Sequence, residues 1–149
     1  MIRRFDKSTD VDLLIAGEVE AYTNSYPGSP VPLDLVTNRI RFIERNRVRC
    51  AVLDENGPKG YVIATKFLRK TRCEIYIESV YITPELRGRG KLEMLFDSLV
   101  DESADNVISL DVSVVNQAAI DAYKTLGFEI LRYRVTREYP VQKGNSDED

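Results

Sequence analysis

The sequence contains no histidine, and this absence removes several classes of active site at once. A Ser-His-Asp triad, a Cys-His pair, a histidine general base and a zinc site with histidine ligands all need an imidazole. If the chain is an enzyme, its proton transfers must therefore depend on carboxylates, tyrosine, lysine, cysteine or water.

Cysteine is scarce, and long apolar runs are missing. Cys50 and Cys73 are the only two cysteines, too few for a disulfide framework or a cysteine-only zinc site, so we expect free thiols and no metal. No apolar run approaches the roughly 20 residues that span a bilayer, and the N-terminus lacks the apolar core of a signal peptide. These absences predict a cytoplasmic protein with no membrane partner.

The charge balance is slightly acidic. Lysine and arginine total 21 against 24 aspartates and glutamates, a net charge of −3, which predicts no nucleic-acid partner. Basic residues nevertheless gather in two segments. These are Arg39, Arg41, Arg45, Arg47 and Arg49 in one, and Lys66, Arg69, Lys70 and Arg72 in the other. We interpret them as a solvated helix face and a hairpin tip, with an acidic acceptor or a nucleic acid as the alternative.

The length and the hydrophobic pattern indicate one globular domain. The chain has 149 residues, 43% of them hydrophobic, and we expect residues 1–140 to form a single domain and the acidic residues 141–149 a disordered tail. Strand-like segments are expected at residues 2–5, 50–53, 61–68, 73–83, 108–114 and 128–139. Helices are expected near residues 11–22, 33–43, 92–100 and after 116. Ser8, Thr9 or Asp10 can cap the first helix; Asn116 can cap the last, with Gly127 just past its end.

This order predicts an α/β fold with a mixed sheet and helices on both faces. Three consecutive strands in the middle of the chain favour antiparallel pairing. The strand-helix-strand passage over residues 79–114 favours one parallel pair with a right-handed crossover.

A glycine-rich turn follows the long central strand and opens a helix. Residues 78–92 read ESVYITPELRGRGKL, so Arg87, Gly88, Arg89, Gly90 and Lys91 follow one another. Free backbone N–H groups and three cations suit a pyrophosphate, and glycine lets the backbone approach it closely. The spacing fits neither the P-loop nor the Rossmann fingerprint, and a tight turn with solvated cations would look the same.

A second motif lies downstream, where residues 111–128 read DVSVVNQAAIDAYKTLGF. Asn116, Tyr123, Gly127 and Phe128 follow the pattern Asn-x6-Tyr-x3-Gly-Phe. With the glycine-rich turn, this segment resembles the GNAT superfamily of acyl-coenzyme A-dependent N-acyltransferases. The resemblance extends over residues 2–139 and implies that family's mostly antiparallel sheet with one parallel strand pair.

The phosphate loop of that family reads Arg/Gln-x-x-Gly-x-Gly/Ala. Arg87 and Gly90 match its first two fixed positions, whereas Leu92 stands where glycine or alanine is usual. Because Leu92 also starts the apolar stripe of its helix, we expect it to point into the core; the alternative is that it crowds the pyrophosphate.

The resemblance implies an acetyltransferase that uses acetyl-CoA and a primary amine, either a small molecule or a peptide N-terminus. The resemblance implies that Glu78 is the general base, acting directly or through water, or that it binds the acceptor amine. Glu74 is the other candidate carboxylate for this role. We expect partial burial to raise the pKa of Glu78. Tyr123 becomes the acid that protonates the leaving thiolate, with a packed aromatic as the alternative.

The resemblance also implies how the cofactor is held. The main chain of the central strand pairs with the pantetheine arm, and the N–H of Val80 faces the oxyanion. The implied cofactor-binding residues are Val80, Tyr81, Ile82, Arg87, Gly88, Arg89, Gly90, Lys91, Leu92, Asn116 and Tyr123. A catalytically silent acyl-CoA-binding regulatory module or a protein-interaction module is the alternative function, and a monomer and a homodimer are both compatible with the sequence.

Overall fold

The computed structural model describes residues 1–141. The expected acidic tail falls, except for residue 141, outside the described residues. The chain divides into two compact units, the first spanning Met1–Asp111 and the second beginning at Val112, and each is described by itself. The single domain expected over residues 1–140 stays a prediction.

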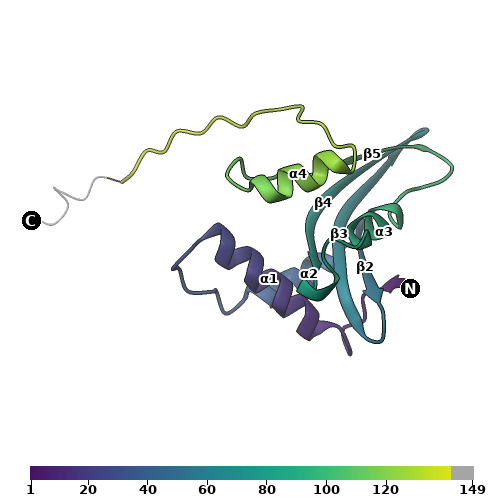
Figure 1. Ribbon diagram of the computed structural model, residues 1–149, viewed down its shortest axis with the longest axis horizontal. Helices are drawn as coiled ribbons and strands as arrows, with labels where there is room; N and C mark the ends of the chain where they lie inside the picture. The colour runs from purple at the N-terminus through teal and green to yellow at the C-terminus, as the bar shows by residue number, and fades with distance from the viewer. Residues whose placement is uncertain (142–149) are drawn as a thin grey trace, which may run out of the picture. The chain divides into compact units, whose positions relative to one another are not determined.

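The elements follow the expected order as far as the last helix (Figure 1). The first unit contains β1 (Ile2–Arg4), α1 (Val11–Ser25), α2 (Leu35–Ile43), β2 (Val48–Asp54), β3 (Pro58–Arg69), β4 (Arg72–Ile82), the 3-10 turn η1 (Pro84–Leu86), α3 (Lys91–Asp97) and β5 (Asp105–Ser109). The second unit contains α4 (Gln117–Thr125). None of the helices within residues 1–141 is both long enough and apolar enough to cross a membrane.

The five strands form one sheet in the order β1-β2-β3-β4-β5. The first four pair antiparallel, and β4 pairs parallel with β5, which confirms the predicted mixed sheet. The β2–β3 turn contains Asn56 and Gly57, with φ of 59° and 114°, the left-handed conformations that tight hairpin turns require. The parallel pair is joined through α3, as a crossover connection demands.

Helices cover both faces of the sheet. Val52 and Leu53 are neighbours on β2, so their side chains point to opposite faces, and both are fully buried. On one face, Leu14 of α1 packs with Tyr61 and Ile63 of β3. On the other, α3 contacts β2 and β3 and buries Leu95 (Figure 1). Burying one leucine side chain fully contributes about 1.5–3 kcal/mol, so both layers stabilise the sheet.

Two strand predictions need correction. The strand expected at residues 108–114 lies at Asp105–Ser109, because parallel pairing with β4 ends where Tyr76 meets Ser109. The strands expected over residues 128–139 are wrong, since these residues form no regular element in the described chain. Leu131 and Val135 are 84% and 93% exposed there. Apolar alternation does not make a strand without a sheet edge to pair with.

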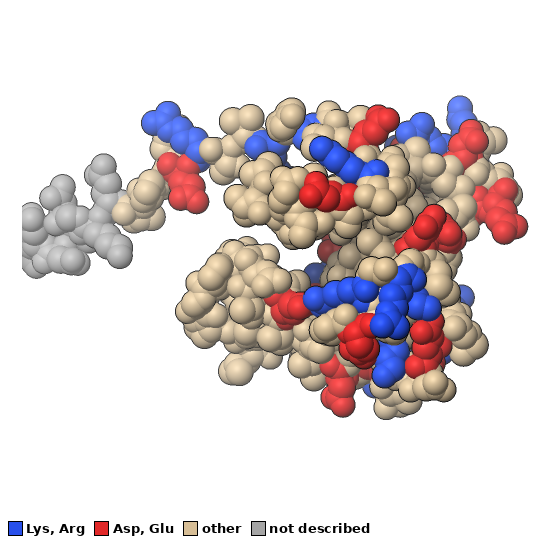
Figure 2. Space-filling model, viewed as in Figure 1, with Lys and Arg blue, Asp and Glu red and all other residues tan. Residues whose placement is uncertain are grey.

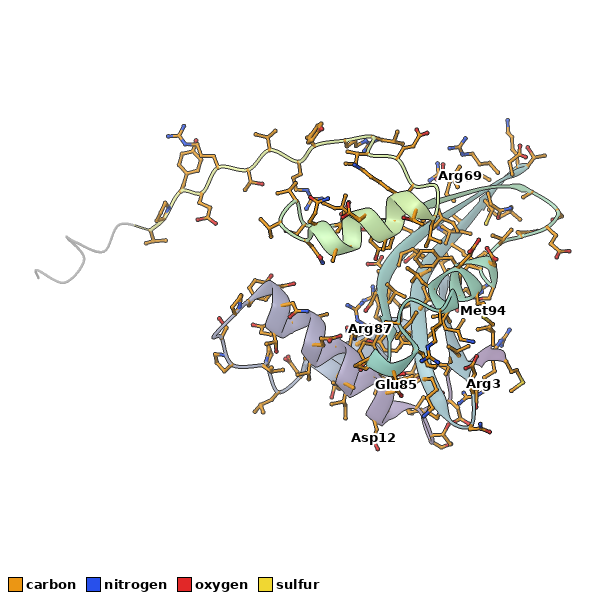
Figure 3. All side chains as sticks on the ribbon, in the orientation of Figure 1. Arg3, Asp12, Arg69, Glu85, Arg87 and Met94 are labelled. Carbon is orange, nitrogen blue, oxygen red and sulfur yellow. The ribbon has the colours of Figure 1, made fainter. Side chains whose placement is uncertain are left out.

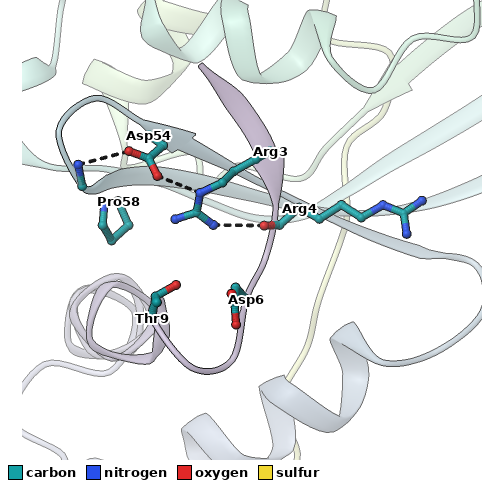
Figure 4. Close-up of a pocket in the computed structure, with 7 residues that line it drawn as sticks. Arg3, Arg4, Asp6, Thr9, Asp54 and Pro58 are labelled. Atoms are coloured by element: carbon teal, nitrogen blue, oxygen red, sulfur yellow. Dashed lines mark hydrogen bonds and ion pairs between the residues drawn. The ribbon is translucent and has the colours of Figure 1, made fainter.

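The start of α1 also differs from expectation. Asp10 occupies the N-cap position, but its carboxylate makes no cap hydrogen bond. It accepts instead from Arg3 Nη1 and Nη2 at 2.7 and 2.8 Å and from the Asp6 N–H at 2.7 Å. Arg3 Nε also donates to Asp54 at 2.7 Å (Figure 4). Burial alone would raise the pKa of Asp10, but the hydrogen bonds outweigh it, and the pKa is lowered.

Candidate functional site at the open edge of β4

The central strand β4 carries a bulge at Glu78. Ile63 of β3 lies opposite Ser79, whereas the next residue, Ala64, lies opposite Ile77. Glu78 is therefore the extra residue on β4. A bulge bends its strand and re-aims a side chain, and bulges are common beside active sites.

The Glu78 side chain is exposed, so the partial burial expected for it is not observed. Its Oε1 accepts a hydrogen bond from Thr65 Oγ1 at 3.2 Å, and it forms no ion pair within the described residues. The rival Glu74 lies near the start of β4, where it pairs with Arg69 and Arg72 at 3.8 and 3.5 Å. Of these two carboxylates, Glu78 is the one that a cationic or proton-donating ligand can reach without breaking an ion pair.

One edge of β4 opens just beyond the β5 pairing. The ladder with β5 ends at Tyr76, so residues 77–82 pair with β3 alone in the described part of the chain. The Thr83 N–H donates to the Lys59 carbonyl at 2.9 Å, which shows that Thr83 faces β3. Because successive residues alternate between the two edges, Ile82 and Val80 direct their N–H and C=O groups to the open edge.

A glycine-containing loop joins β4 to α3. Gly88 and Gly90 have φ of 74° and 77°, and Gly90 is the N-cap of α3. A Cβ added at either position would meet nothing within 4 Å. Glycine is therefore required for its backbone conformation, and the space above the loop is open to a ligand.

The three cations of this loop differ in their partners. Arg87 Nη2 pairs with Glu20 of α1 at 2.9 Å, and Lys91 Nζ pairs with Glu55 of the β2–β3 turn at 2.6 Å. Arg89 is exposed and forms no ion pair with a described residue. On the face of the first unit seen in Figure 2, basic and acidic side chains accordingly lie next to one another.

Leu92, which stands where the family pattern has glycine or alanine, lies in the first turn of α3. This residue is half-buried, whereas Leu95 and Phe96 in the next turn are buried. We expected Leu92 to point into the core, but its side chain is only half-buried. Whether it crowds a bound pyrophosphate stays a prediction.

The downstream motif forms a compact local arrangement in the second unit. Asn116 caps α4, with its side-chain oxygen accepting from the Ala119 N–H at 3.2 Å. Gly127 has φ of 92° just past the helix. The rings of Tyr123 and Phe128 meet edge to face at 5.6 Å, and burial raises the pKa of Tyr123. The capping role of Asn116 is confirmed, whereas cofactor contacts by Asn116 and Tyr123 stay predictions.

A buried carboxylate beside the bulge was missed by the sequence reasoning. Glu18 of α1 is 4% exposed. It accepts from Tyr61 Oη at 2.6 Å, Ser79 Oγ at 2.7 Å and Arg39 Nε at 2.7 Å. We call Glu18, Tyr61, Ser79 and Arg39 the Glu18 network. The available signal was a charged residue four positions after Leu14, on the apolar face of the helix.

The network fixes the packing of its neighbours. A Cβ on Gly17 would lie 2.2 Å from the Tyr61 hydroxyl, so only glycine lets the tyrosine reach Glu18. Burial, followed by the charge of Glu18, raises the pKa of Tyr61. Arg39, expected on a solvated face, instead joins α2 to α1. Ser79 directly follows the bulge, so the network holds β4 where its register resumes.

Comparison with known proteins adds family information to this geometry. A model of the acetyltransferase (GNAT) family matches residues 14–128. The uncharacterized protein ML0378 of Mycobacterium leprae is 32% identical over 82 residues, which are 55% of this chain and 23% of that relative. The chain thus matches less than a quarter of the length of this curated relative.

Solved structures share the fold at low sequence identity. The tetramutant of the BH1408 protein from Bacillus halodurans has a TM-score of 0.74 at 19% identity, covering 95% of this chain and 99% of that one. AAC(6')-Iy in complex with the bisubstrate analog CoA-S-monomethyl-acetylneamine has a TM-score of 0.68 at 14% identity, covering 95% and 98%. At these identities the likeness establishes the fold.

Proposed function

Because the chain belongs to the acetyltransferase (GNAT) family, we propose that it transfers an acetyl group from acetyl-CoA to a primary amine. The observation that carries this proposal is the open edge of β4, which leads directly into the glycine-containing loop at residues 87–92. This juxtaposition offers main-chain hydrogen bonds for an extended arm and an adjoining place for its phosphates.

Donor binding uses both parts of this arrangement. The pantetheine arm adds to the sheet beside Val80 and Ile82, whose main-chain groups face outward, in the manner of an added strand. The pyrophosphate lies over Gly88 and Gly90, where no side chain intervenes. Because α3 has only seven residues, we assign most of the phosphate attraction to loop N–H groups and cations rather than to a helix dipole.

Transfer requires a neutral amine and a stabilised oxyanion. An alkyl ammonium has a pKa of about 10.4, so the acceptor must lose a proton before it attacks the thioester. We assign this role to Glu78, acting directly or through water, with binding of the acceptor ammonium as the alternative. The outward N–H of Val80 lies two residues further along β4 and serves as the oxyanion donor. Tyr123 is assigned as the acid that protonates the thiolate.

A small-molecule amine is the acceptor class that we favour. Glu78 is exposed and forms no ion pair among residues 1–141, which suits a cationic amine. AAC(6')-Iy, which has a similar fold, is bound to the bisubstrate analog CoA-S-monomethyl-acetylneamine. A peptide N-terminus is the second class. A catalytically silent acyl-CoA-binding module is the alternative without chemistry.

The test is a thiol-release assay with acetyl-CoA against aminoglycosides, polyamines and short peptides with free N-termini. We expect release with a small amine and a loss of about 100-fold or more in kcat for Glu78→Gln, since general bases typically contribute that much. Glu102→Gln is the matched control, because it makes the same carboxylate-to-amide change at an exposed residue outside the site. Acetyl-CoA binding without release by any amine would favour the silent module, and no binding at all would overturn the proposal.

A further inference from the structure

Arg87, the first fixed position of the loop, is held by three neighbours. Its Nη2 donates to both carboxylate oxygens of Glu20, at 2.9 and 3.1 Å. Its Nε donates to the Ile82 carbonyl at 2.9 Å, and its guanidinium lies 5.6 Å from the centre of the Tyr81 ring. Figure 3 shows Arg87 between the end of β4 and helix α1.

These contacts conflict with the role that acyl-CoA binding requires. The guanidinium N–H groups given to Glu20 and Ile82 are unavailable to a phosphate. Moreover, Ile82 directs its carbonyl to the open edge, so Arg87 occupies one of the main-chain acceptors that an added pantetheine strand would use. A forked phosphate contact through Nε and Nη2, like the edge contact at Ile82, therefore requires Arg87 to leave its present partners.

We propose that Glu20 sets the affinity of this chain for acyl-CoA by competing with the cofactor phosphates for Arg87. The inference rests on the proposed function, because it concerns the same site. Glu20 opposes binding in two ways: it holds the guanidinium, and once the guanidinium leaves, it remains as an unpaired negative charge near the phosphates. An affinity-determining residue thus lies on α1, outside the loop motif.

The exposure of the pair makes this exchange feasible. The side chains of Arg87 and Glu20 are 47% and 42% exposed, so water screens their attraction. The two phosphates of a pyrophosphate together carry more negative charge than one carboxylate, and their oxygens match the guanidinium fork equally well. Lys91 and Glu55 form a tighter and less exposed pair, at 2.6 Å with 20% and 32% exposure.

The test is the dissociation constant of acetyl-CoA, measured by calorimetry at low salt. We expect Glu20→Gln to bind about two- to five-fold more tightly than the parent, the range set by exposed ion pairs. Glu44→Gln is the matched control, because Glu44 is also an exposed glutamate in an ion pair, with Lys7 at 3.8 Å. It makes the same change in net charge and should leave the constant unchanged.

A double-mutant cycle links the effect to Arg87. Arg87→Met should weaken binding, and in that background Glu20→Gln should have no effect beyond the Glu44 control. Unchanged or weaker binding by Glu20→Gln, equal tightening by both glutamine variants, or tightening that persists without Arg87 would each overturn the inference while the proposed function stands. If the parent chain binds no acetyl-CoA, the proposed function falls, and the inference falls with it.

Discussion

Replacing Tyr61 with phenylalanine would remove one hydroxyl from the Glu18 network and leave the ring in place. Tyr61 is 1% exposed, and its hydroxyl donates to Glu18 at 2.6 Å. The vacated space is one oxygen atom, so the lost hydrogen bond should dominate the effect. Hydrogen bonds to charged groups contribute about 1.5–3 kcal/mol. Glu18 keeps its bonds from Ser79 and Arg39, which places the expected loss at about 2 kcal/mol.

The assay is thermal and urea unfolding followed by circular dichroism. For a chain of this size, the loss corresponds to a Tm lowered by roughly 4–8 °C. Tyr81→Phe is the matched control: its ring lies 5.9 Å from that of Tyr61, and its hydroxyl makes no hydrogen bond with a described residue. We expect this control to change stability by less than about 0.5 kcal/mol.

Equal losses in the two phenylalanine variants would refute the reasoning, because they would show that the Glu18 hydrogen bond contributes nothing specific. A second check uses Ser79→Ala. The Ser79 and Tyr61 hydroxyls share the same Glu18 oxygen, so their effects should be non-additive by about 0.5 kcal/mol or more.

Three further predictions concern other parts of the first unit. Gly17→Ala should lower the free energy of unfolding by about 1–3 kcal/mol in urea titrations, because its Cβ would lie 2.2 Å from the Tyr61 hydroxyl; an unchanged midpoint would contradict the packing. The lowered pKa of Asp10 stabilises the fold above about pH 4, and this contribution should fade as the pH drops through the folded-state pKa. Arg3→Met should reduce the fall in Tm between pH 7 and pH 3. A pH profile of Tm equal to that of the parent would argue against a stabilising Arg3–Asp10 pair. The desolvation of the half-buried Cys50 raises its pKa to about 12, so mass spectrometry should find it unmodified by iodoacetamide at pH 7 in the folded protein; rapid alkylation there would contradict the raised pKa.

Local patterns predicted the parts of the fold that depend on nearby residues. The cap at Asn116 and the glycine at Gly127 need only a few neighbours, and both are observed. The strand at residues 73–83 was predicted within a residue at each end, because the segment is rich in β-branched and aromatic residues and stops at Pro84. The left-handed glycines at 88 and 90 likewise follow from the sequence of the turn.

Features that depend on distant partners were missed. Arg87 pairs with a glutamate 67 positions away, and nothing in the spacing around either residue indicates this. The bulge at Glu78 results from how β3 and β4 align, which neither strand determines alone. The strands expected over residues 128–139 failed for the related reason that alternation specifies a face but not a partner.

The Glu18 network has a consequence for the order of folding. Its hydrogen bonds connect residues 21, 43 and 61 positions apart, so the carboxylate is fully satisfied only after α2, β3 and β4 have all reached α1. A collapsed chain with α1 docked in another register would bury a charge without partners, at a large desolvation penalty. One acidic residue on an otherwise apolar face therefore disfavours other docking registers of α1, and because its partners are non-local we expect its contribution to form late in folding.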